Sequence, residues 1–149
     1  MTIAAVSLLD VLRDHATDVP ALERLLDHHP VERSWIRLRS EADVELWLIS
    51  WPPGSRTDWH DHGPSAGAFT VLEGELVEHS WERALRQRDL APGDSRAFRA
   101  GYAHDVHNSS DEPALSLHAY SPRLQTMTRY RFHGDRLEVL GVEQAGQSW

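Results

Sequence analysis

The sequence predicts an all-β protein, a sandwich or barrel of short strands that follows a short helical segment. From residue 33 onward, apolar and polar residues alternate with the period of two that is typical of strands. Clusters of Gly, Pro, Asn, Asp and Ser interrupt this alternation at short intervals, as turns do in a sandwich or barrel. The chain has 149 residues, the usual size of one domain. We therefore expect a single domain over 1–149, with a helical segment over 1–32, a β-barrel over 33–140 and a tail over 141–149.

The first 30 residues predict two helices. Ser7 can cap the first helix, with Asp10 three positions later in a variant of the capping box. Asp18 followed by Pro20 is typical of a second helix start, and Pro30 ends that helix. Three leucines of the second helix are expected to face inward: Leu22, Leu25 and Leu26.

Ten strands are expected in the alternating part of the chain. Their ranges are 33–39, 43–50, 57–62, 68–73, 75–82, 95–99, 103–108, 114–120, 127–132 and 136–140. Turn residues such as Pro52-Pro53-Gly54 and Ala91-Pro92-Gly93-Asp94 separate them. Three acidic residues beside one of these turns are expected to form a solvated hairpin: Glu73, Glu75 and Glu78.

The composition excludes several classes of protein and of site. The formal net charge is −8 without a visible basic stripe, so no nucleic-acid partner is expected. No apolar run approaches the length that spans a bilayer, and the first residues lack the pattern of a signal peptide, so we expect a cytoplasmic protein with no membrane partner. There is no Cys, which excludes disulfides, thiolate ligands and a cysteine nucleophile. All 15 basic residues are Arg, and the lack of Lys excludes Schiff-base chemistry.

His60 and His62 are the strongest candidates for metal ligands. Residues two apart on a strand point to the same face, so both imidazoles can reach one point. Neutral imidazole is a common ligand for Zn, Fe, Cu and Ni. His104 is the third candidate, whereas His107 lies at odd spacing from it, on the opposite strand face. Asp61 points away from the two histidines that flank it and is expected to be a local hydrogen-bond partner.

The glycines around these histidines resemble the two motifs of the cupin superfamily. The first motif, G-x5-H-x-H-x4-E-x6-G, is matched in spacing by Gly54, His60, His62, Gly67 and Gly74. The second motif, G-x5-P-x-G-x2-H-x3-N, is matched by Gly93, Arg99, Gly101, His104 and Asn108. Gly67 replaces the Glu that is usually a fourth ligand, and Arg99 replaces Pro. The resemblance implies a cupin double-stranded β-helix, jelly-roll-like, with a site of three histidines.

Cupins without this Glu include the cysteine dioxygenases, and the chain is similar to their bacterial members over roughly 33–132. The matching segments are Trp51-Pro52-Pro53-Gly54-Ser55, His60-Asp61-His62-Gly63-Pro64-Ser65-Ala66-Gly67 and Ser116-Leu117-His118-Ala119-Tyr120-Ser121-Pro122. The resemblance implies Fe(II) on His60, His62 and His104, and oxidation of a thiol such as cysteine to its sulfinate with O2. It also implies a hydrogen-bonded relay of Ser116, His118 and Tyr120, whose alternation places all three on one strand face.

A substrate carboxylate calls for an arginine, because the planar guanidinium binds carboxylates through two hydrogen bonds. Arg37 and Arg39 are the candidates, two apart on an early strand, and the register of the family favours Arg37. Trp51 is expected to line the substrate pocket, and the resemblance places Met127 at the pocket entrance.

Two alternatives stay open at this point. The nearer one is a dioxygenase for another thiol carboxylate such as 3-mercaptopropionate, for which a Gln would replace the arginine; no Gln occurs between residues 30 and 50, which favours cysteine. The other is a non-oxidative cupin that binds or isomerises a small molecule with Zn or Mn, since three histidines suit several ions. We expect a monomer or a small homo-oligomer.

Overall fold

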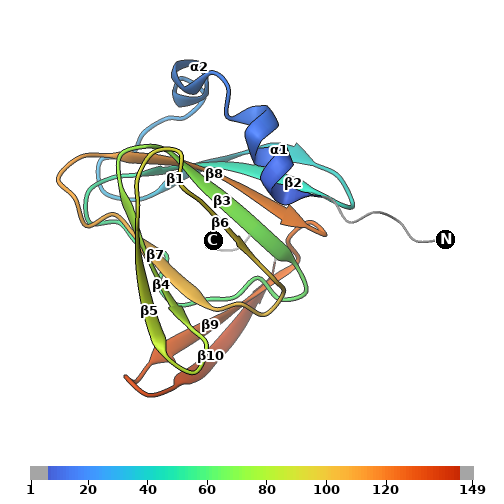
Figure 1. Cartoon of the computed structure of the whole chain (residues 1–149), viewed down its shortest axis with the longest axis vertical. Coiled ribbons are helices and arrows are strands. Elements are labelled where there is room, and N and C mark those ends of the chain that lie inside the picture. The colour runs from blue at the N-terminus through green and yellow to red at the C-terminus, as the bar shows by residue number, and fades with distance from the viewer. Residues whose placement is uncertain (1–6, 145–149) are drawn as a thin grey trace.

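The computed structural model describes residues 7–144, which form two short helices followed by β-strands (Figure 1). The helices are α1 (Leu8–His15) and α2 (Val19–Glu23). The strands are β1 (Ser34–Ser40), β2 (Glu45–Trp51), β3 (Ala66–Glu73), β4 (Leu76–Trp81), β5 (Leu85–Leu90), β6 (Ser95–Phe98), β7 (His104–His107), β8 (Ala114–Ser121), β9 (Thr126–Phe132) and β10 (Leu137–Gln144). In this part of the chain, neither helix is long and apolar enough to cross a membrane.

The strands form one large antiparallel sheet and two small ones. The large sheet has the order β1-β2-β8-β3-β6, and the small sheets have the orders β5-β4-β7 and β10-β9. Figure 1 shows the large sheet facing the two small sheets across the interior of the protein. The all-β class predicted from the alternation is therefore confirmed.

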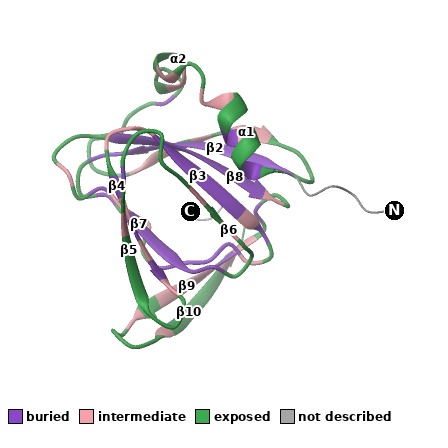
Figure 2. Ribbon diagram, viewed as in Figure 1, coloured by how far each residue is buried: buried purple, intermediate pink, exposed green. Residues whose placement is uncertain are grey.

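The central strands of the large sheet are buried on both faces. All seven residues of β2 are buried, because successive side chains point to opposite faces of the sheet and both faces are covered. Leu46 and Leu48 pack outward under Leu8 and Leu12 of α1, whereas Trp51 packs into the interior between the sheets. Figure 2 shows the buried strands β2, β3 and β8 beneath α1. The helix thus closes the outer face and leaves the inner face for the site.

Both predicted helix starts are confirmed. The side chain of Ser7 accepts a hydrogen bond from the backbone N–H of Asp10, and Asp18 caps α2 in the same way. The second helix ends at Glu23, well before Pro30. Leu26 is buried as predicted, but the inward placement of Leu25 was wrong, because its side chain is 51% exposed.

The predicted strands agree with the structure within a few residues, with three differences. The segment 57–62 is no strand: Asp58 has a positive φ of 64°, and His60 forms only isolated bridges. Strand β5 was not predicted, because five of its six residues are not buried and their polar side chains hide the alternation. Strand β10 continues to residue 144, so part of the predicted tail is a strand, while the rest of the tail, 145–149, lies outside the described residues.

Candidate metal centre

His60, His62 and His104 converge on one point in the interior. Their ligand nitrogens lie within 4.8 Å of one another, and all three residues are buried. His60 and His62 belong to the loop between β2 and β3, and His104 begins β7. The backbones of His60 and His104 exchange two hydrogen bonds of 3.0 Å. These bonds fix the position of His60 in the loop relative to His104 on β7. The predicted convergence of three imidazoles is therefore present in the structure.

The outer nitrogens of two of these rings are held by acceptors. Nδ1 of His60 lies 2.7 Å from the backbone carbonyl oxygen of Asp58, and Nδ1 of His104 lies 2.8 Å from Oε2 of Glu78. A carbonyl oxygen can only accept, so Nδ1 of His60 carries the proton and Nε2 keeps its lone pair. Each ring is thus prepared to offer Nε2 as a ligand.

His62 supplies the strongest indication of a bound cation. Both of its ring nitrogens are buried, and neither has a hydrogen-bond partner among the described residues. A buried polar atom without a partner costs about 1–3 kcal/mol, so such atoms in native proteins call for a ligand, ion or water. A metal ion shared with the neighbouring imidazoles would supply the partner of one nitrogen.

The protonation state of the rings suits metal binding. Burial, with the nearby His104, holds the pKa of His60 well below its usual range. Burial, with His60 and His104 beside it, does the same for the pKa of His62. Both rings are therefore neutral at physiological pH, which is the form that binds metals.

Asp61 holds the ligand loop in place. Its Oδ1 accepts hydrogen bonds from the backbone N–H groups of Gly63 (2.9 Å) and Thr128 (3.1 Å), and Oδ2 accepts one from the Tyr130 hydroxyl (2.6 Å). Burial and the hydrogen bond to Asp61 raise the pKa of Tyr130 to about 12. The prediction of a local hydrogen-bond partner is confirmed, and the clamp ties the loop to strand β9.

The position of Gly67 explains why the site has three ligands. A Cβ atom at Gly67 would lie 2.4 Å from the ring of Phe98 and 3.0 Å from that of Tyr120. These two rings also enclose His62, with centroid distances of 5.0 and 4.9 Å. The Glu of the general cupin motif therefore has no room here, and aromatic rings occupy its place.

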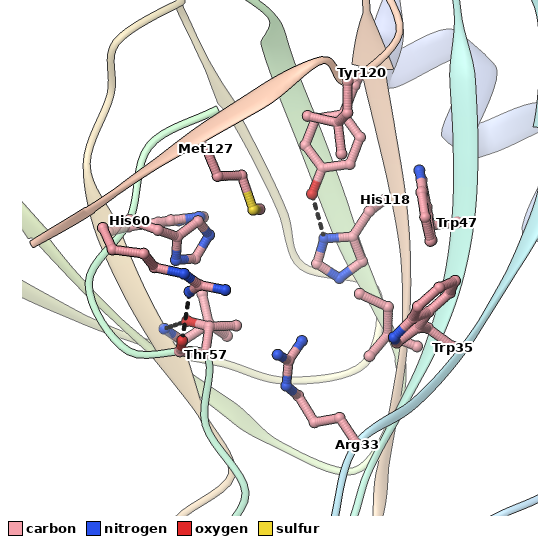
Figure 3. A pocket seen from close by; sticks show the side chains of 13 residues that line it. Arg33, Trp35, Trp47, Thr57, His60, His118, Tyr120 and Met127 are labelled. Carbon is pink, nitrogen blue, oxygen red and sulfur yellow. Dashed lines mark hydrogen bonds between the residues drawn. The ribbon is translucent and has the colours of Figure 1, made fainter. Parts of the chain in front are cut away.

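The predicted relay residues lie in line on the inner face of β8. Oγ of Ser116 lies 2.7 Å from Nε2 of His118, and Nδ1 of His118 lies 3.5 Å from the Tyr120 hydroxyl (Figure 3). Burial lowers the pKa of His118 to about 3 and raises the pKa of Tyr120. His118 is therefore a neutral imidazole, and Tyr120 is a neutral phenol.

A cavity opens in front of these groups. Six of the residues that line it are Arg33, Trp47, His60, His104, His118 and Tyr120. Figure 3 shows Arg33 reaching into the space between Thr57 and Trp35, on the side opposite Tyr120. Met127 lines the cavity as well, in agreement with its predicted place. The cavity thus joins two of the three imidazoles, the end of the relay and a half-buried guanidinium.

The sequence model of the family described as cysteine dioxygenase type I matches residues 6–133 of the chain. The chain belongs to the cysteine dioxygenase type I family. Cysteine dioxygenase type 1 of Danio rerio is 30% identical over 93 residues, which cover 54% of this chain and 46% of that protein. The Homo sapiens protein is 32% identical over 104 residues, covering 59% and 50%. The chain spans about half the length of these relatives.

Solved structures show the cupin fold. The protein TT1209 from Thermus thermophilus superposes with a TM-score of 0.61 at 32% identity, covering 68% of this chain and 93% of that one. A Klebsiella pneumoniae protein with a double-stranded β-helix domain has a TM-score of 0.59 at 18% identity, covering 79% and 92%. The predicted double-stranded β-helix is therefore confirmed.

In this cysteine dioxygenase family member, the predicted arginines lie outside the cavity lining. Arg37 is 51% exposed on its side chain, lies 3.5 Å from Glu45 and stacks over the ring of Trp47. Arg39 pairs with Glu41 at the surface. Arg33 occupies the cavity, and within the described part of the chain it has no carboxylate partner. The best candidate for a carboxylate-binding arginine is therefore Arg33.

Trp51 also differs from its predicted role. Its side chain is fully buried and is not among the residues that line the cavity. The indole N–H donates a hydrogen bond of 2.7 Å to Oγ of Ser116, and the ring lies under the guanidinium of Arg33, 5.3 Å from its Cζ. Trp51 thus contacts both Ser116 of the relay and Arg33 without lining the cavity itself.

Sequence reasoning did not identify Arg33, Arg129 or Glu78 as residues of the site. A signal for Arg33 was present, because it lies two residues before Trp35 and shares its strand face. Arg129, two residues after Met127, also lines the cavity, and its guanidinium donates to the carbonyl oxygen of Thr57. Glu78 was assigned to a solvated hairpin, but it is fully buried, so that prediction was wrong.

Proposed function

We propose that the chain is an Fe(II)-dependent thiol dioxygenase that oxidises a small thiol carboxylate, with cysteine as the first candidate, to its sulfinate. One observation carries this proposal: two of the three clustered imidazoles, the Tyr120 end of the relay and Arg33, which has no carboxylate partner among the described residues, line one cavity. Membership in the cysteine dioxygenase type I family supports the same reaction class.

The donor set fits a divalent iron ion. His60, His62 and His104 would hold Fe(II) through neutral imidazoles, and the ion would supply the redox chemistry that joins O2 to a thiol. In the overall reaction both oxygen atoms become bonded to sulfur, the S–H bond breaks and its proton is released. Sulfur loses the four electrons that O2 accepts, so no external reductant is needed.

Arg33 is the residue that we expect to bind the substrate carboxylate. Burial, with the nearby charge of Arg129, lowers the pKa of Arg33, yet a guanidinium stays charged at physiological pH. A half-buried cation without a carboxylate partner among the described residues favours an anionic ligand, and a carboxylate can accept two hydrogen bonds from the guanidinium. Trp51 behind Arg33 fixes the guanidinium from the opposite side.

The relay directs the hydroxyl proton of Tyr120 toward the cavity. The indole N–H of Trp51 can only donate, so Ser116 accepts from it and is free to donate to Nε2 of His118. The buried Ser116 hydroxyl then has an acceptor, and the proton of neutral His118 resides on Nδ1, facing Tyr120. Tyr120 accepts this proton's hydrogen bond and can donate its own to a substrate or to oxygen in the cavity.

A second candidate substrate is a thiol carboxylate without an amino group, such as 3-mercaptopropionate. Among the described residues that line the cavity there is no Asp or Glu, and the two charged side chains are Arg33 and Arg129. An ammonium group would therefore lack an anionic partner in this lining, whereas a neutral amine would not need one. The absence of Gln between residues 30 and 50 still favours cysteine.

Oxygen consumption by the Fe(II)-loaded protein tests this proposal. We expect uptake with cysteine or 3-mercaptopropionate, formation of the matching sulfinate, and loss of both in His104→Ala. The ratio of the two rates identifies the preferred thiol. Stable binding of Zn or Mn, without oxygen uptake in the presence of either thiol, would favour the non-oxidative cupin instead.

A further inference from the structure

Glu78 is a fully buried carboxylate on the inner face of β4. The burial pattern of this strand alternates, and it places Leu76, Glu78 and Ser80 inside. Its neighbours in the predicted hairpin differ: Glu75 is exposed and Glu73 is partly exposed. Burying an ionised carboxylate is costly unless it is paired and hydrogen-bonded, so the partners of Glu78 indicate what the residue does.

Both oxygens of Glu78 are engaged, each with a different kind of partner. Oε2 accepts from Nδ1 of His104 at 2.8 Å, and Oε1 accepts from Nε of Arg96 at 2.9 Å. Arg96 comes from β6 in the large sheet, so the carboxylate joins the two facing sheets. Arg88 lies 3.8 Å from the same oxygen. The carboxylate is therefore compensated by arginines on one side and directed at a single imidazole on the other.

The three imidazoles are supported unequally. His60 is backed by the carbonyl oxygen of Asp58, and neither nitrogen of His62 has a partner among the described residues. Of the three, His104 has the contact with a carboxylate. At the same time, Gly67 leaves no room for the acidic ligand of the general cupin motif.

We propose that Glu78 is a positioning residue of the metal site, which supplies through His104 the negative charge that the ligand set lacks. This inference rests on the proposed metal site. The carboxylate holds the proton of His104 on Nδ1, so that Nε2 faces the metal with its lone pair. Donation to a carboxylate also makes the imidazole a stronger ligand, as in the carboxylate–histidine–metal arrangements of other metalloproteins.

Arg96 reduces the negative charge that Glu78 supplies through His104, but it does not remove it. Its guanidinium binds Oε1, whereas His104 binds Oε2, so the two hydrogen bonds do not compete for one oxygen. Arg96 also reaches the hydroxyl of Tyr102 at 3.4 Å, which fixes the guanidinium at the edge of the site. The carboxylate is thus held in one orientation before any metal binds.

Cobalt(II) binding to the full chain tests the inference, because this ion gives an absorption spectrum that reports its ligands. In Glu78→Gln we expect an affinity about 10- to 100-fold weaker than that of the wild type, the usual effect of losing such a partner. The ligand-field bands should shift as well, which a general loss of stability would not cause. Asp105→Asn is the matched control, because Asp105 is another buried carboxylate paired with an arginine, Arg56, and its side chain, although it follows His104 in the chain, has no hydrogen bond to a proposed ligand among the described residues.

The possible outcomes separate the inference from the proposed function. Wild-type affinity and an unchanged spectrum in Glu78→Gln, with weak binding by His104→Ala, would overturn the role of Glu78 alone. Equal binding by the wild type and His104→Ala would overturn the metal site and the inference together. If Glu78→Gln does not fold, nitrogen-15 NMR of the wild type decides: the proton of the His104 ring must be on Nδ1, and a proton on Nε2 contradicts the inference.

Discussion

Trp51 and Ser116 are joined by a hydrogen bond of 2.7 Å between the indole N–H and Oγ, across 65 residues of chain. They lie on the neighbouring strands β2 and β8, with both side chains buried. Because the indole can only donate, this bond gives the relay through His118 its direction. The far end of the relay therefore depends on a residue that does not line the cavity.

Trp51→Phe should keep the ring and remove the donor. We expect the free energy of unfolding to fall by about 1–3 kcal/mol, since the buried Ser116 hydroxyl loses a partner. Thiol oxidation should slow, because Ser116 can then turn its proton away from His118. Trp59→Phe is the matched control, as Trp59 stacks on Phe132 away from the relay. Equal rates for Trp51→Phe and the control would contradict this account; denaturant unfolding and oxygen uptake provide the measurements.

Arg33→Gln should raise KM for a thiol carboxylate by about 10- to 150-fold. This range corresponds to the loss of a charge-assisted interaction of about 1.5–3 kcal/mol. Arg37→Gln should leave KM nearly unchanged, because Arg37 lies outside the cavity lining and pairs with Glu45. Steady-state oxygen uptake at varied thiol concentration measures both. A large effect in Arg37→Gln alone would restore the assignment made from the sequence.

Gly67→Ala should destabilise the protein, because its Cβ would lie 2.4 Å from the ring of Phe98. Overpacking of this kind costs about 1–3 kcal/mol. The double variant Gly67→Ala/Phe98→Leu should recover part of that loss, since the ring that causes the clash is gone. Thermal unfolding of the two single variants and the double variant gives the coupling. Strictly additive effects would show that Phe98 is not what excludes a side chain at position 67.

Site residues that lie close together in the sequence could be predicted, whereas those that depend on the pairing of distant segments were missed. The strand triplet from Ser116 to Tyr120 could be predicted because residues two apart on a strand share a face, whereas His60 and His62 lie in a loop and were identified by the spacing of the cupin motif. To identify Arg33, the register of β1 against β2 would have had to be known. Ser34 pairs with Ser50, so Arg33 lies at the end of β2 from which the ligand loop starts, whereas Arg37 lies farther along.

Glu78 could not be found from spacing at all. Its role comes from the pairing of β4 with β7, which brings it beside His104, and from Arg96 on another sheet. A glutamate four residues after a turn glycine is usually solvated, and only the alternation with Leu76 and Ser80 indicated burial. Contacts between strands that are distant in the sequence build this part of the site, and such contacts produce no recognisable pattern in the local sequence.

His118 should make the metal-free protein sensitive to acid. Its pKa is about 3 in the folded state, below the value of 6.5 of a free imidazole, because burial disfavours the charged ring. Below pH 6.5 the unfolded chain therefore binds a proton that the folded chain does not, and stability falls as pH falls from 6.5 toward about 3. Between pH 7 and pH 5 this single group should cost about 2 kcal/mol.

His118→Gln isolates that contribution, because Gln cannot titrate and can still bond to Ser116. The buried rings of His60 and His62 act in the same direction, so the wild type and the variant must be compared at each pH. We expect the variant to be less stable at pH 7 and the difference to shrink by about 2 kcal/mol at pH 5. A difference that stays constant between these pH values in denaturant unfolding would mean that His118 accepts a proton inside the folded protein. The relay could then not hold His118 as the neutral imidazole that its hydrogen bonds to Ser116 and Tyr120 require.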